Sequence, residues 1–329
     1  MSDGIVVRGR AFEWRLVRVT AADGEQEYKV GRGLAGASRT IGFAVVTLIY
    51  VAAGLAAWCL SIMVGSHHPL AVTWWADLAA TVVVFAGSMA VGNSSLYDPY
   101  WSVAPAVIVV AWLVAARVTT IRPVLVAALI LIWAIRLTAN WARSWRGLSH
   151  EDWRYVQIRA ETRGRLPWWL VSLTGIQLMP TVVVFSGMLA VWPTVTVRDR
   201  TLGPLDLAAV LVTAAAIALE AVADRQLHRF AADPAHRGRA ADRGLWRYSR
   251  HPNYLGEIGF WWGLWLFALA AAPPWWWTIA GPVAMLVLFA FVSVPMMDRR
   301  SLARRAGYAE HMRRVPALLP LPGRSRAGH

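Results

Sequence analysis

One stretch of the sequence, Gly244–Glu257, gathers arginine, histidine, asparagine, tyrosine and glutamate within fourteen positions. Pro252 disfavours helix in the residues just before it, so we expect Arg250 and His251 to lie on a non-helical segment. Asn253 is then predicted to cap the helix that follows. The start of a helix offers free N–H groups and a positive dipole, and here arginines accompany it. The pattern therefore predicts an anion-binding site.

Two further sets of polar residues lie at the ends of apolar runs. Glu220 and Asp224 are four positions apart and share one helix face. Arg136, Asn140 and Arg143 recur at i, i+4 and i+7, which also places them on one face. An arginine fork beside a planar amide suits phosphate or carboxamide recognition. Simple solvation of the carboxylates and snorkelling of the arginines to lipid headgroups are the alternative readings.

Asp98 is the third candidate, because it stands beside Tyr100 at the predicted mouth between two apolar runs. A helix-capping role before Pro99 is its structural alternative. Glu151–Tyr155 mixes both charges with two aromatic residues, and we expect it to make contacts within the protein. Gly31–Gly36 matches a dinucleotide fingerprint in letters, but it lacks the following acidic residue and the strand–helix context, so we expect no such site there.

These residues must be positioned by membrane helices. The chain has 329 residues, of which 57% are hydrophobic and 16% charged, with 33 basic against 19 acidic side chains and a net charge of +14. An ordinary soluble enzyme and a disulfide scaffold are excluded by this balance. Twenty tryptophans and long uncharged runs argue against a nucleic-acid partner. One cysteine and no zinc-like spacing predict no metal site.

We therefore predict an all-α, polytopic transmembrane bundle with about eight spans, seven or nine being the alternatives. The uncharged runs place the spans at roughly 41–64, 70–91, 103–116, 123–141, 168–192, 204–223, 255–271 and 275–297. Three arginine-rich segments, between spans four and five, between spans six and seven, and after span eight, predict that both termini face the cytoplasm. The predicted location is a bacterial plasma membrane.

Three parts are predicted along the chain. Residues 1–38 form a cytoplasmic arm, which the pattern around Gly24 suggests is a small hairpin. Residues 39–92 hold the first two spans. Residues 93–329 form the domain that carries every candidate site residue.

That domain resembles a known family. Gly244–Glu257 is similar to the C-terminal signature of the membrane steroid 5-alpha-reductase-like superfamily, shared in reduced form with sterol C14 and C7 reductases and isoprenylcysteine carboxyl methyltransferases. The order and spacing of four further motifs are similar to the bacterial reductase-like branch. They are Glu220-x3-Asp224-x-Gln226, Arg136-x3-Asn140-Trp141, Glu151–Tyr155 and Tyr308-x11-Pro320. The resemblance covers roughly residues 85–322.

The resemblance implies that the C-terminal half binds NADPH at the cytoplasmic face. The implied cofactor-binding residues are Arg136, Asn140, Arg143, Glu220, Asp224, Arg247, Tyr248, Arg250, His251, Asn253, Tyr254 and Glu257. In the steroid reductases a carboxylate on an early span and a tyrosine two spans later hold the substrate carbonyl. Asp98 resembles the carboxylate, whereas Trp133, which has no phenol, stands where the tyrosine is expected. Because Tyr100 stands beside Asp98, we expect it to assist that acid.

The expected reaction is NADPH-dependent reduction of a conjugated carbon–carbon double bond in an apolar lipid or steroid-like substrate from the bilayer. Asp98 and Tyr100 are the predicted catalytic residues, because developing enolate charge needs a positioned acid. An S-adenosylmethionine-dependent methyltransferase acting on a lipid or isoprenylcysteine is the alternative, since it shares Arg250-His251-Pro252-x-Tyr254-x-Gly256. Its acidic pair is incomplete here, at Met296-Met297-Asp298. A scaffold or lipid-binding protein without activity is the second alternative.

Overall fold

The computed structural model describes residues 14–21, 24–31, 37–65, 68–118, 120–197 and 200–319. Parts of the predicted arm and of the Gly31–Gly36 motif, together with Pro320, lie outside these residues. Within the arm, strands β1 (Trp14–Ala21) and β2 (Gly24–Gly31) pair antiparallel, with Ala21 opposite Gly24. The pairing matches the predicted hairpin.

Eight helical segments of the described chain are long and apolar enough to cross a membrane, which confirms the predicted count and the all-α class of the membrane part. They cover Arg39–Met63, Pro69–Val91, Ser94–Ala115, Ile121–Ser144, Trp168–Met188, Pro204–Ala232, Pro252–Ala271 and Pro273–Arg304. The third begins nine positions before the predicted start at residue 103, because a short 3₁₀ turn continues into the helix. The polar residues of that turn hid it from a hydropathy pattern.

The chain divides into two compact units, and three helices pass from one to the other. Unit 1 comprises Met1–Ala104 and Leu137–Val182, and unit 2 comprises Pro105–Arg136 and Val183–His329. The three helices that both units share are α3 (Tyr100–Ala115), α4 (Ile121–Ser144) and α7 (Met179–Met188). The predicted boundary between residues 92 and 93, which separates the first two spans from the domain with the candidate site residues, stays a prediction.

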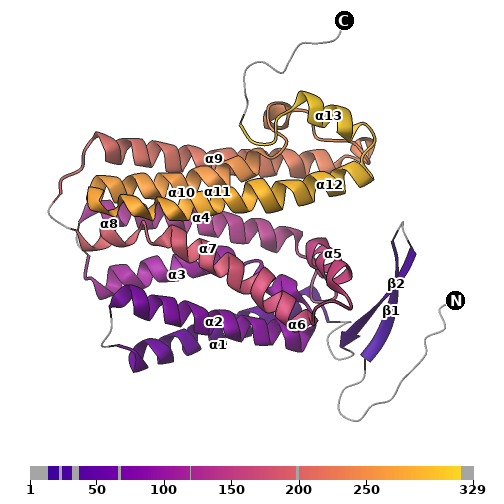
Figure 1. Ribbon diagram of the computed structural model, residues 1–329, viewed down its shortest axis with the longest axis horizontal. Coiled ribbons are helices and arrows are strands. Elements are labelled where there is room, and N and C mark those ends of the chain that lie inside the picture. The colour runs from indigo at the N-terminus through magenta and orange to yellow at the C-terminus, as the bar shows by residue number, and fades with distance from the viewer. Residues whose placement is uncertain are drawn as a thin grey trace, which may run out of the picture. The chain divides into compact units, whose positions relative to one another are not determined.

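Unit 1 holds the first spans of the chain (Figure 1). Besides the hairpin, its own elements are α1 (Arg39–Met63), α2 (Pro69–Val91), η1 (Ser94–Tyr97), α5 (Trp153–Thr162), α6 (Trp168–Val171) and the π-helix η2 (Ser172–Leu178). The hydroxyl of Ser38 caps the start of α1 by accepting from the N–H of Ile41, and Gly92 ends α2 in the left-handed region. Both ends follow ordinary capping chemistry.

Unit 2 holds the later spans, of which α9, α10 and α11 lie side by side in Figure 1. Its own elements are α8 (Trp192–Thr196), α9 (Pro204–Ala232), η3 (Pro234–His236), η4 (Gly244–Arg247), α10 (Pro252–Ala271), η5 (Pro273–Ile279), α11 (Ala280–Leu288), the π-helix η6 (Phe289–Ser293), α12 (Val294–Arg304) and α13 (Tyr308–Arg314). The Pro273-Pro274 turn separates α10 from η5, as the sequence predicts.

The helices α9 and α10 approach each other closely because glycines line the contact. A Cβ atom on Gly256 would lie 2.8 Å from the carbonyl oxygen of Ala216 and 2.9 Å from the backbone nitrogen of Glu220. On Gly263 it would lie 2.1 Å from the hydroxyl oxygen of Thr213. Small residues thus let the two backbones pack together, as in many membrane helix pairs.

A buried ion pair joins α4 and α9 at the opposite end of α4 from Arg136. The guanidinium of Arg122 donates to both oxygens of Asp206, at 2.7 and 3.0 Å, and also to the backbone carbonyls of Arg200 and Thr201. Asp206 also accepts from the N–H of Gly203, the residue before α9, and so caps the start of that helix. Both charged groups are therefore satisfied within the protein.

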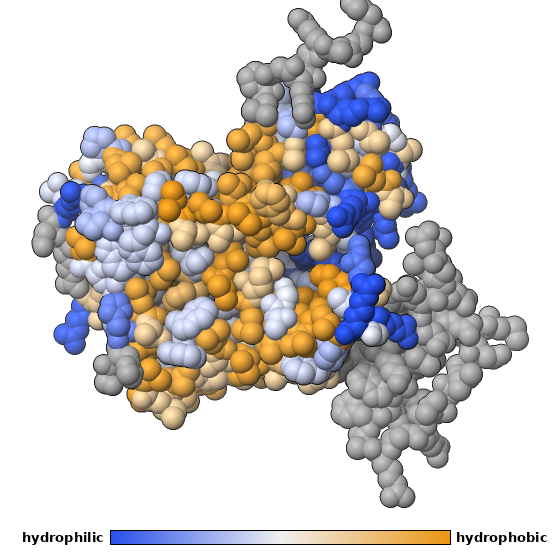
Figure 2. Space-filling view, viewed as in Figure 1, coloured by the Kyte–Doolittle hydropathy of each residue, from blue (hydrophilic) through white to orange (hydrophobic). Residues whose placement is uncertain are grey.

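The outer surface of the helices is apolar (Figure 2). Hydrophilic residues on the visible face lie around α13 and the neighbouring end of α12, near α5, and at the opposite ends of the spans. Large hydrophobic side chains are exposed on several spans, among them Leu55 and Trp58 on α1 and Phe291 at η6. Such a surface suits contact with membrane lipids and not with water.

Replacing Arg122 by methionine leaves the carboxylate of Asp206 buried without its cation. We expect a loss of about 3–5 kcal/mol of unfolding free energy, because an uncompensated buried charge is costly. Denaturant unfolding in detergent measures it. The control is Glu310→Gln, which breaks an exposed pair with Arg313 and Arg314 and is expected to change stability little, because water screens such pairs. Equal losses in the two variants would contradict the assignment.

Replacing Gly256 by alanine forces α10 away from α9. The expected cost is about 1–3 kcal/mol, since overpacking against backbone atoms cannot relax through a side chain. Gly54 on α1 is the matched control, because a Cβ atom there meets no atom within 4 Å. Gly54→Ala is expected to leave stability unchanged or slightly raised, since alanine favours helix. Thermal unfolding of both purified variants makes the comparison, and a neutral Gly256→Ala would refute the packing argument.

Candidate functional site

The carboxylate of Asp298, near the end of the last span, binds three side chains of unit 2. Arg250 donates from Nε and Nη2 at 3.3 and 2.7 Å, and Tyr308 donates its hydroxyl proton at 2.7 Å. The Nε2 atom of His251 lies 3.0 Å from the same carboxylate. The four residues come from three parts of the chain, namely the segment before α10, α12 and α13, and the one acid joins these parts.

The residues that follow α13 complete this network. Arg250 also donates to the carbonyl of Val315, while the backbone N–H groups of Arg250 and His251 bind the carbonyls of Pro316 and Ala317 at 2.9 and 3.1 Å. Two backbone hydrogen bonds therefore hold the segment before α10 against the residues that follow α13. Because all three guanidinium nitrogens of Arg250 have partners, this side chain joins the segment before α10 to α12 and to the residues after α13.

Two titratable groups of α13 lie at this network. Burial raises the pKa of Tyr308 to about 12, and the neighbouring Asp298 carboxylate adds to the shift. Tyr308 thus stays a phenol and a hydrogen-bond donor. Burial lowers the pKa of His311, and the Arg250 guanidinium lowers it further. A neutral imidazole at this position can both accept and donate a hydrogen bond.

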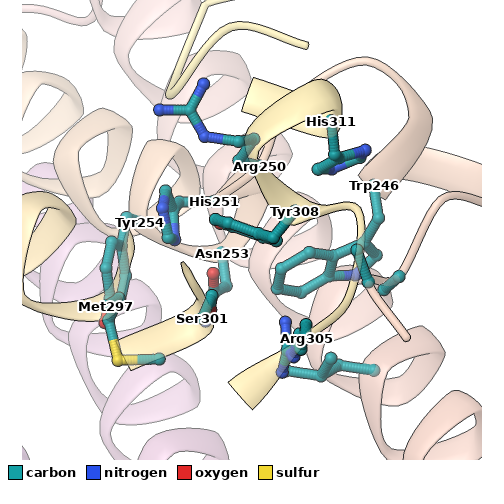
Figure 3. Close-up of a pocket in the computed structure, with 13 residues that line it drawn as sticks. Trp246, Arg250, His251, Asn253, Tyr254, Met297, Ser301, Arg305, Tyr308 and His311 are labelled. Atoms are coloured by element: carbon teal, nitrogen blue, oxygen red, sulfur yellow. The ribbon is translucent and has the colours of Figure 1, made fainter. Parts of the chain in front are cut away.

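A small cavity of about 60 Å³ opens beside the network (Figure 3). In the figure the rings of Tyr308 and Trp246 lie close together near Asn253 and Ser301, whereas the guanidinium of Arg250 points away from them. It is lined by Leu227, Ala240, Ala241, Trp246, Arg250, His251, Asn253, Tyr254, Met297, Ser301, Arg305, Tyr308 and His311. These come from α9, α10, α12, α13 and the segments between them, so residues distant in sequence meet at one place.

Asn253 connects the cavity with a second cluster on α9 and α4. Its amide nitrogen donates to Asp224 at 3.3 Å, and Asp224 also accepts from Arg136 at 3.0 Å. Arg136 forms a further ion pair with Glu220 at 2.5 Å. The predicted face-sharing of Glu220 and Asp224 is thus confirmed, because both carboxylates meet one guanidinium.

This cluster leaves buried polar atoms without partners. In the described part of the chain the Oδ1 atom of Asn253, the Nε atom of Arg136 and the Oε2 atom of Glu220 have no hydrogen-bond partner. Buried polar groups in native proteins are nearly always paired, so these three atoms mark where a polar ligand or water is accommodated.

Glu257, one turn into α10, is held by tryptophans. The indole nitrogens of Trp133 and Trp261 donate to its two carboxylate oxygens at 2.9 and 3.0 Å, and Trp133 also stacks on Phe260. Glu257 is 4% exposed and does not line the cavity. Trp133, which stands where the resemblance implies a tyrosine, therefore positions a carboxylate.

One local prediction is wrong. Helix α10 begins at Pro252 with His251 at the capping position, so Asn253 is already inside the helix and does not cap it. The reason is that proline is favoured in the first turn, where its missing N–H has no partner to lose. His251 has the predicted non-helical backbone, and its ring stacks on Tyr254 at 5.2 Å.

The remaining predicted cofactor residues are not in the cavity. Arg247 and Tyr248 are exposed, with the guanidinium lying over the tyrosine ring. Asn140 and Arg143 belong to unit 1, where Asn140 is half-buried and Arg143 is exposed. Arg136 lies on the unit 2 side of the same helix.

In unit 1 the side chains of Asp98 and Tyr100 bind different partners, and the predicted catalytic role of the two stays a prediction. The Asp98 carboxylate accepts from the hydroxyl of Tyr155 and lies 3.5 Å from Arg154. Glu151 accepts from the backbone N–H of Ser94 at 2.8 Å. The Glu151–Tyr155 motif therefore makes the expected contacts, and it holds the turn that carries Asp98.

Tyr100 instead pairs with Asp77, a buried carboxyl on α2 that the sequence analysis did not select. The phenol donates to Oδ1 of Asp77 at 2.6 Å, and both residues are 6% exposed. An ionisable residue inside a span is costly and is usually functional. That single acid in an otherwise uncharged run was the signal available in the sequence.

Other residues that sequence reasoning missed lie at the cavity. Asp298 was noticed only as an incomplete acidic pair, and Tyr308 only as part of a closing motif. Ser301, Arg305 and His311 carried no signal, because polar residues after the last span are common in any membrane protein. Only the fold brings them to α10.

Comparison with known proteins gives a family and one distant relative. The family model described as "Protein of unknown function (DUF1295)" matches residues 84–315. The protein C594.04c of Schizosaccharomyces pombe, named as uncharacterized, is 27% identical over 226 residues, which is 60% of this chain and 64% of that protein. The chain thus spans less than two thirds of this relative's length. No solved structure matches.

The matched residues begin near the end of α2 and run through α13, so they include the Asp298 network, the cavity and the Arg136 cluster. They cover more than half of the chain. The protein therefore belongs to the DUF1295 family.

Proposed function

We propose that the protein is an NADPH-dependent membrane reductase of a conjugated carbon–carbon double bond in an apolar lipid or steroid-like substrate. The observation that supports it most is the cavity in unit 2, where Arg250, His251, Asn253 and Tyr254 meet. These four residues are among those that the resemblance to steroid 5-alpha-reductase-like proteins implies for the cofactor. By the distribution of arginines we assign the cavity to the cytoplasmic side.

The chemistry of the cavity fits one end of such a cofactor. Arg305 lines it and forms no ion pair within the described residues, so its guanidinium is available for a phosphate. The unpartnered Oδ1 of Asn253 suits an amide or hydroxyl donor. A volume of about 60 Å³ is well below the several hundred Å³ of complete ligand sites, so these residues account for a part of the dinucleotide only.

Tyr100, one of the catalytic residues predicted from the sequence, is the proton donor in this proposal. When bound, the reduced nicotinamide supplies a hydride for the β-carbon of the substrate's double bond. Tyr100 holds a proton at its phenol oxygen and donates it toward the carbonyl conjugated with that bond, which stabilises the developing enolate. In the structure the phenol donates this proton to Oδ1 of Asp77 at 2.6 Å, so we expect the O–H bond to turn from Asp77 to the carbonyl when the substrate binds. The apolar surroundings exclude water and strengthen the interaction.

NADPH is expected to raise the unfolding temperature of the purified protein, and S-adenosylmethionine is not. A ligand at a hundred times its Kd contributes about 2.7 kcal/mol to the folded state, which a thermal scan detects. Arg305→Gln is expected to weaken NADPH binding about 10- to 100-fold, the effect of losing a charged hydrogen bond. Arg304→Gln is the control, since Arg304 is exposed and does not line the cavity.

The reverse ligand preference, stabilisation by S-adenosylmethionine alone, would overturn the reductase proposal in favour of the methyltransferase. Equal effects of the two arginine variants would show that charge near the membrane, and not the cavity, attracts the nucleotide.

Tyr100→Phe is expected to lower kcat for enone reduction about a hundredfold or more, because it removes the general acid while keeping the ring. Asp77→Asn is expected to lower it as well, whereas Asp98→Asn is expected to keep turnover, since Asp98 is held by Tyr155 and Arg154. Consumption of NADPH with a panel of enones is the measurement, and NADPH binding is expected to stay normal in all three. If Asp98→Asn alone abolishes turnover, the acid is Asp98 and the Asp77 assignment fails.

A further inference from the structure

The end of the last span and the helix α13 form an open groove in unit 2. The groove has a volume of about 640 Å³ and is lined by Leu302 on α12 and by Ala309, Met312 and Arg313 on α13. The three α13 residues stand at i, i+3 and i+4, so they share one face of that helix. None of the four residues lines the cavity of Figure 3, so the groove is a separate feature.

The helix α13 therefore has two different faces. Tyr308 and His311 line the cavity, and Tyr308 is held there by its 2.7 Å hydrogen bond to Asp298. Ala309 and Arg313 are exposed and line the groove instead. Anything that binds in the groove contacts the same helix that brings Tyr308 and His311 to the cavity.

The surroundings of the groove are strongly basic. The helices α12 and α13 carry six arginines and only two acids, Asp298 and Glu310. The arginines are Arg299, Arg300, Arg304, Arg305, Arg313 and Arg314. Asp298 is buried and already binds Arg250. The helices therefore keep an excess of positive charge at this end of the span.

Glu310 does not remove the positive charge at the groove. Its two carboxylate oxygens accept from Nε of Arg313 at 2.9 Å and from Nε of Arg314 at 2.7 Å. Two guanidinium groups thus share one carboxylate, and both arginine side chains are 74% exposed. Exposed pairs of this kind are weak, so Arg313 can turn to a phosphate. The groove therefore suits a ligand with an apolar part and a negative charge.

The position of the groove indicates where such a ligand comes from. Leu302 stands two residues before the end of the last membrane-spanning segment, Pro273–Arg304, and its side chain is 46% exposed. The end of a span lies at the membrane surface, where lipid headgroups and the first carbons of the acyl chains are found. A phospholipid with a net negative charge presents both parts at this level.

Two other occupants fit the charge less well. Residues 320–329 of the chain contain Arg324 and Arg326 and no acid, so they have the same sign of charge as the groove. A second copy of the chain would bring two arginine-rich surfaces together, and like charges across an interface are unfavourable.

We propose that the groove between α12 and α13 binds an anionic phospholipid of the adjacent leaflet. Its apolar part packs on Leu302, Ala309 and Met312, and its phosphate binds Arg313. The bound lipid holds α13 in place and so supports the cavity on the other face of that helix. This binding requires neither NADPH nor a reaction, so it is independent of the proposed function.

The test titrates the purified full-length chain in a neutral detergent with a short-chain phosphatidylglycerol and follows the unfolding temperature. At saturation the lipid is expected to raise this temperature by about 2–4 °C. Phosphatidylcholine with the same acyl chains has no net charge, and inorganic phosphate has no apolar part. Neither is expected to stabilise the protein at the same concentrations.

Arg313→Gln is expected to weaken phosphatidylglycerol binding about 10- to 30-fold, because it removes a charge-assisted hydrogen bond together with the general attraction of a basic surface. Arg304→Gln is the matched control, since Arg304 is also exposed at the end of α12 but does not line the groove. Its loss is expected to be at most about fivefold, the general attraction alone. Equal losses in the two variants would overturn the site.

Leu302→Asn tests the apolar part and is expected to weaken binding about 5- to 10-fold, since a partly exposed leucine loses its contact with the lipid. Leu319→Asn is its control, because Leu319 is 60% exposed and does not line the groove. It is expected to bind the lipid as the wild type does. A Leu302→Asn variant with unchanged binding would contradict the groove.

Three other results would also refute the proposal. Equal stabilisation by inorganic phosphate would show a site for simple anions. A dimer in detergent that Leu302→Asn dissociates, with no effect of phosphatidylglycerol, would show that a second copy fills the groove. Lipid binding only after removal of residues 320–329 would show that the end of the chain fills it.

Hydrogen exchange at the backbone N–H groups of residues 308–315 tests whether the lipid holds α13. Exchange is expected to slow at least about threefold with phosphatidylglycerol in the wild type and in Leu319→Asn, but not in Leu302→Asn. Exchange that the lipid leaves unchanged in the wild type would overturn the support of α13. Because no measurement uses NADPH or an enone, failure of this proposal is distinct from failure of the proposed function.

Discussion

The structure depends on one constraint, that a charge taken out of water must find its partners inside the chain. Asp298 meets it with Arg250, His251 and Tyr308, and Arg122 meets it with Asp206. Desolvation makes an isolated buried charge expensive, so each such pair dictates which helices lie together. The pairs therefore specify which helices pack together, since the apolar surfaces of membrane helices alone distinguish little between alternative packings.

The same constraint explains why many of the arginines bind carboxylates of the protein itself. On composition alone, the arginines of Gly244–Glu257 and of the α4 face are candidates to hold a phosphate. In the fold, Arg136 and Arg250 are occupied by carboxylates of the protein itself. Arg305, which no motif marked, lines the cavity instead. Arginine density in the sequence thus indicates topology and internal pairing first, and ligand contacts only at individual positions.

Much of the fold and part of the candidate site could be predicted from the sequence. What could not be predicted has a physical reason. Long apolar runs predicted the eight spans, because bilayer thickness sets the length of a helix. The four-residue spacing of Glu220 and Asp224 predicted their shared face. The pairing of Tyr100 with Asp77 and of Arg250 with Asp298 could not be predicted, since 23 and 48 positions separate the partners and local periodicity carries no information on which helices meet. The start of α10 was missed by two residues, Asn253 being the predicted cap and His251 the observed one, because proline can open a helix as well as precede one.

The pairing of the segment before α10 with the end of the chain has a consequence for biogenesis. Arg250 and His251 leave the ribosome 48 and 47 positions ahead of Asp298, and still further ahead of the carbonyls of Pro316 and Ala317. Until the last helix has been inserted, these two side chains and their backbone N–H groups have only water or the insertion machinery as partners. Synthesis of residues 308–317 is therefore the step that completes the cavity, and a chain that stops just short of them has all eight spans but not the assembled site.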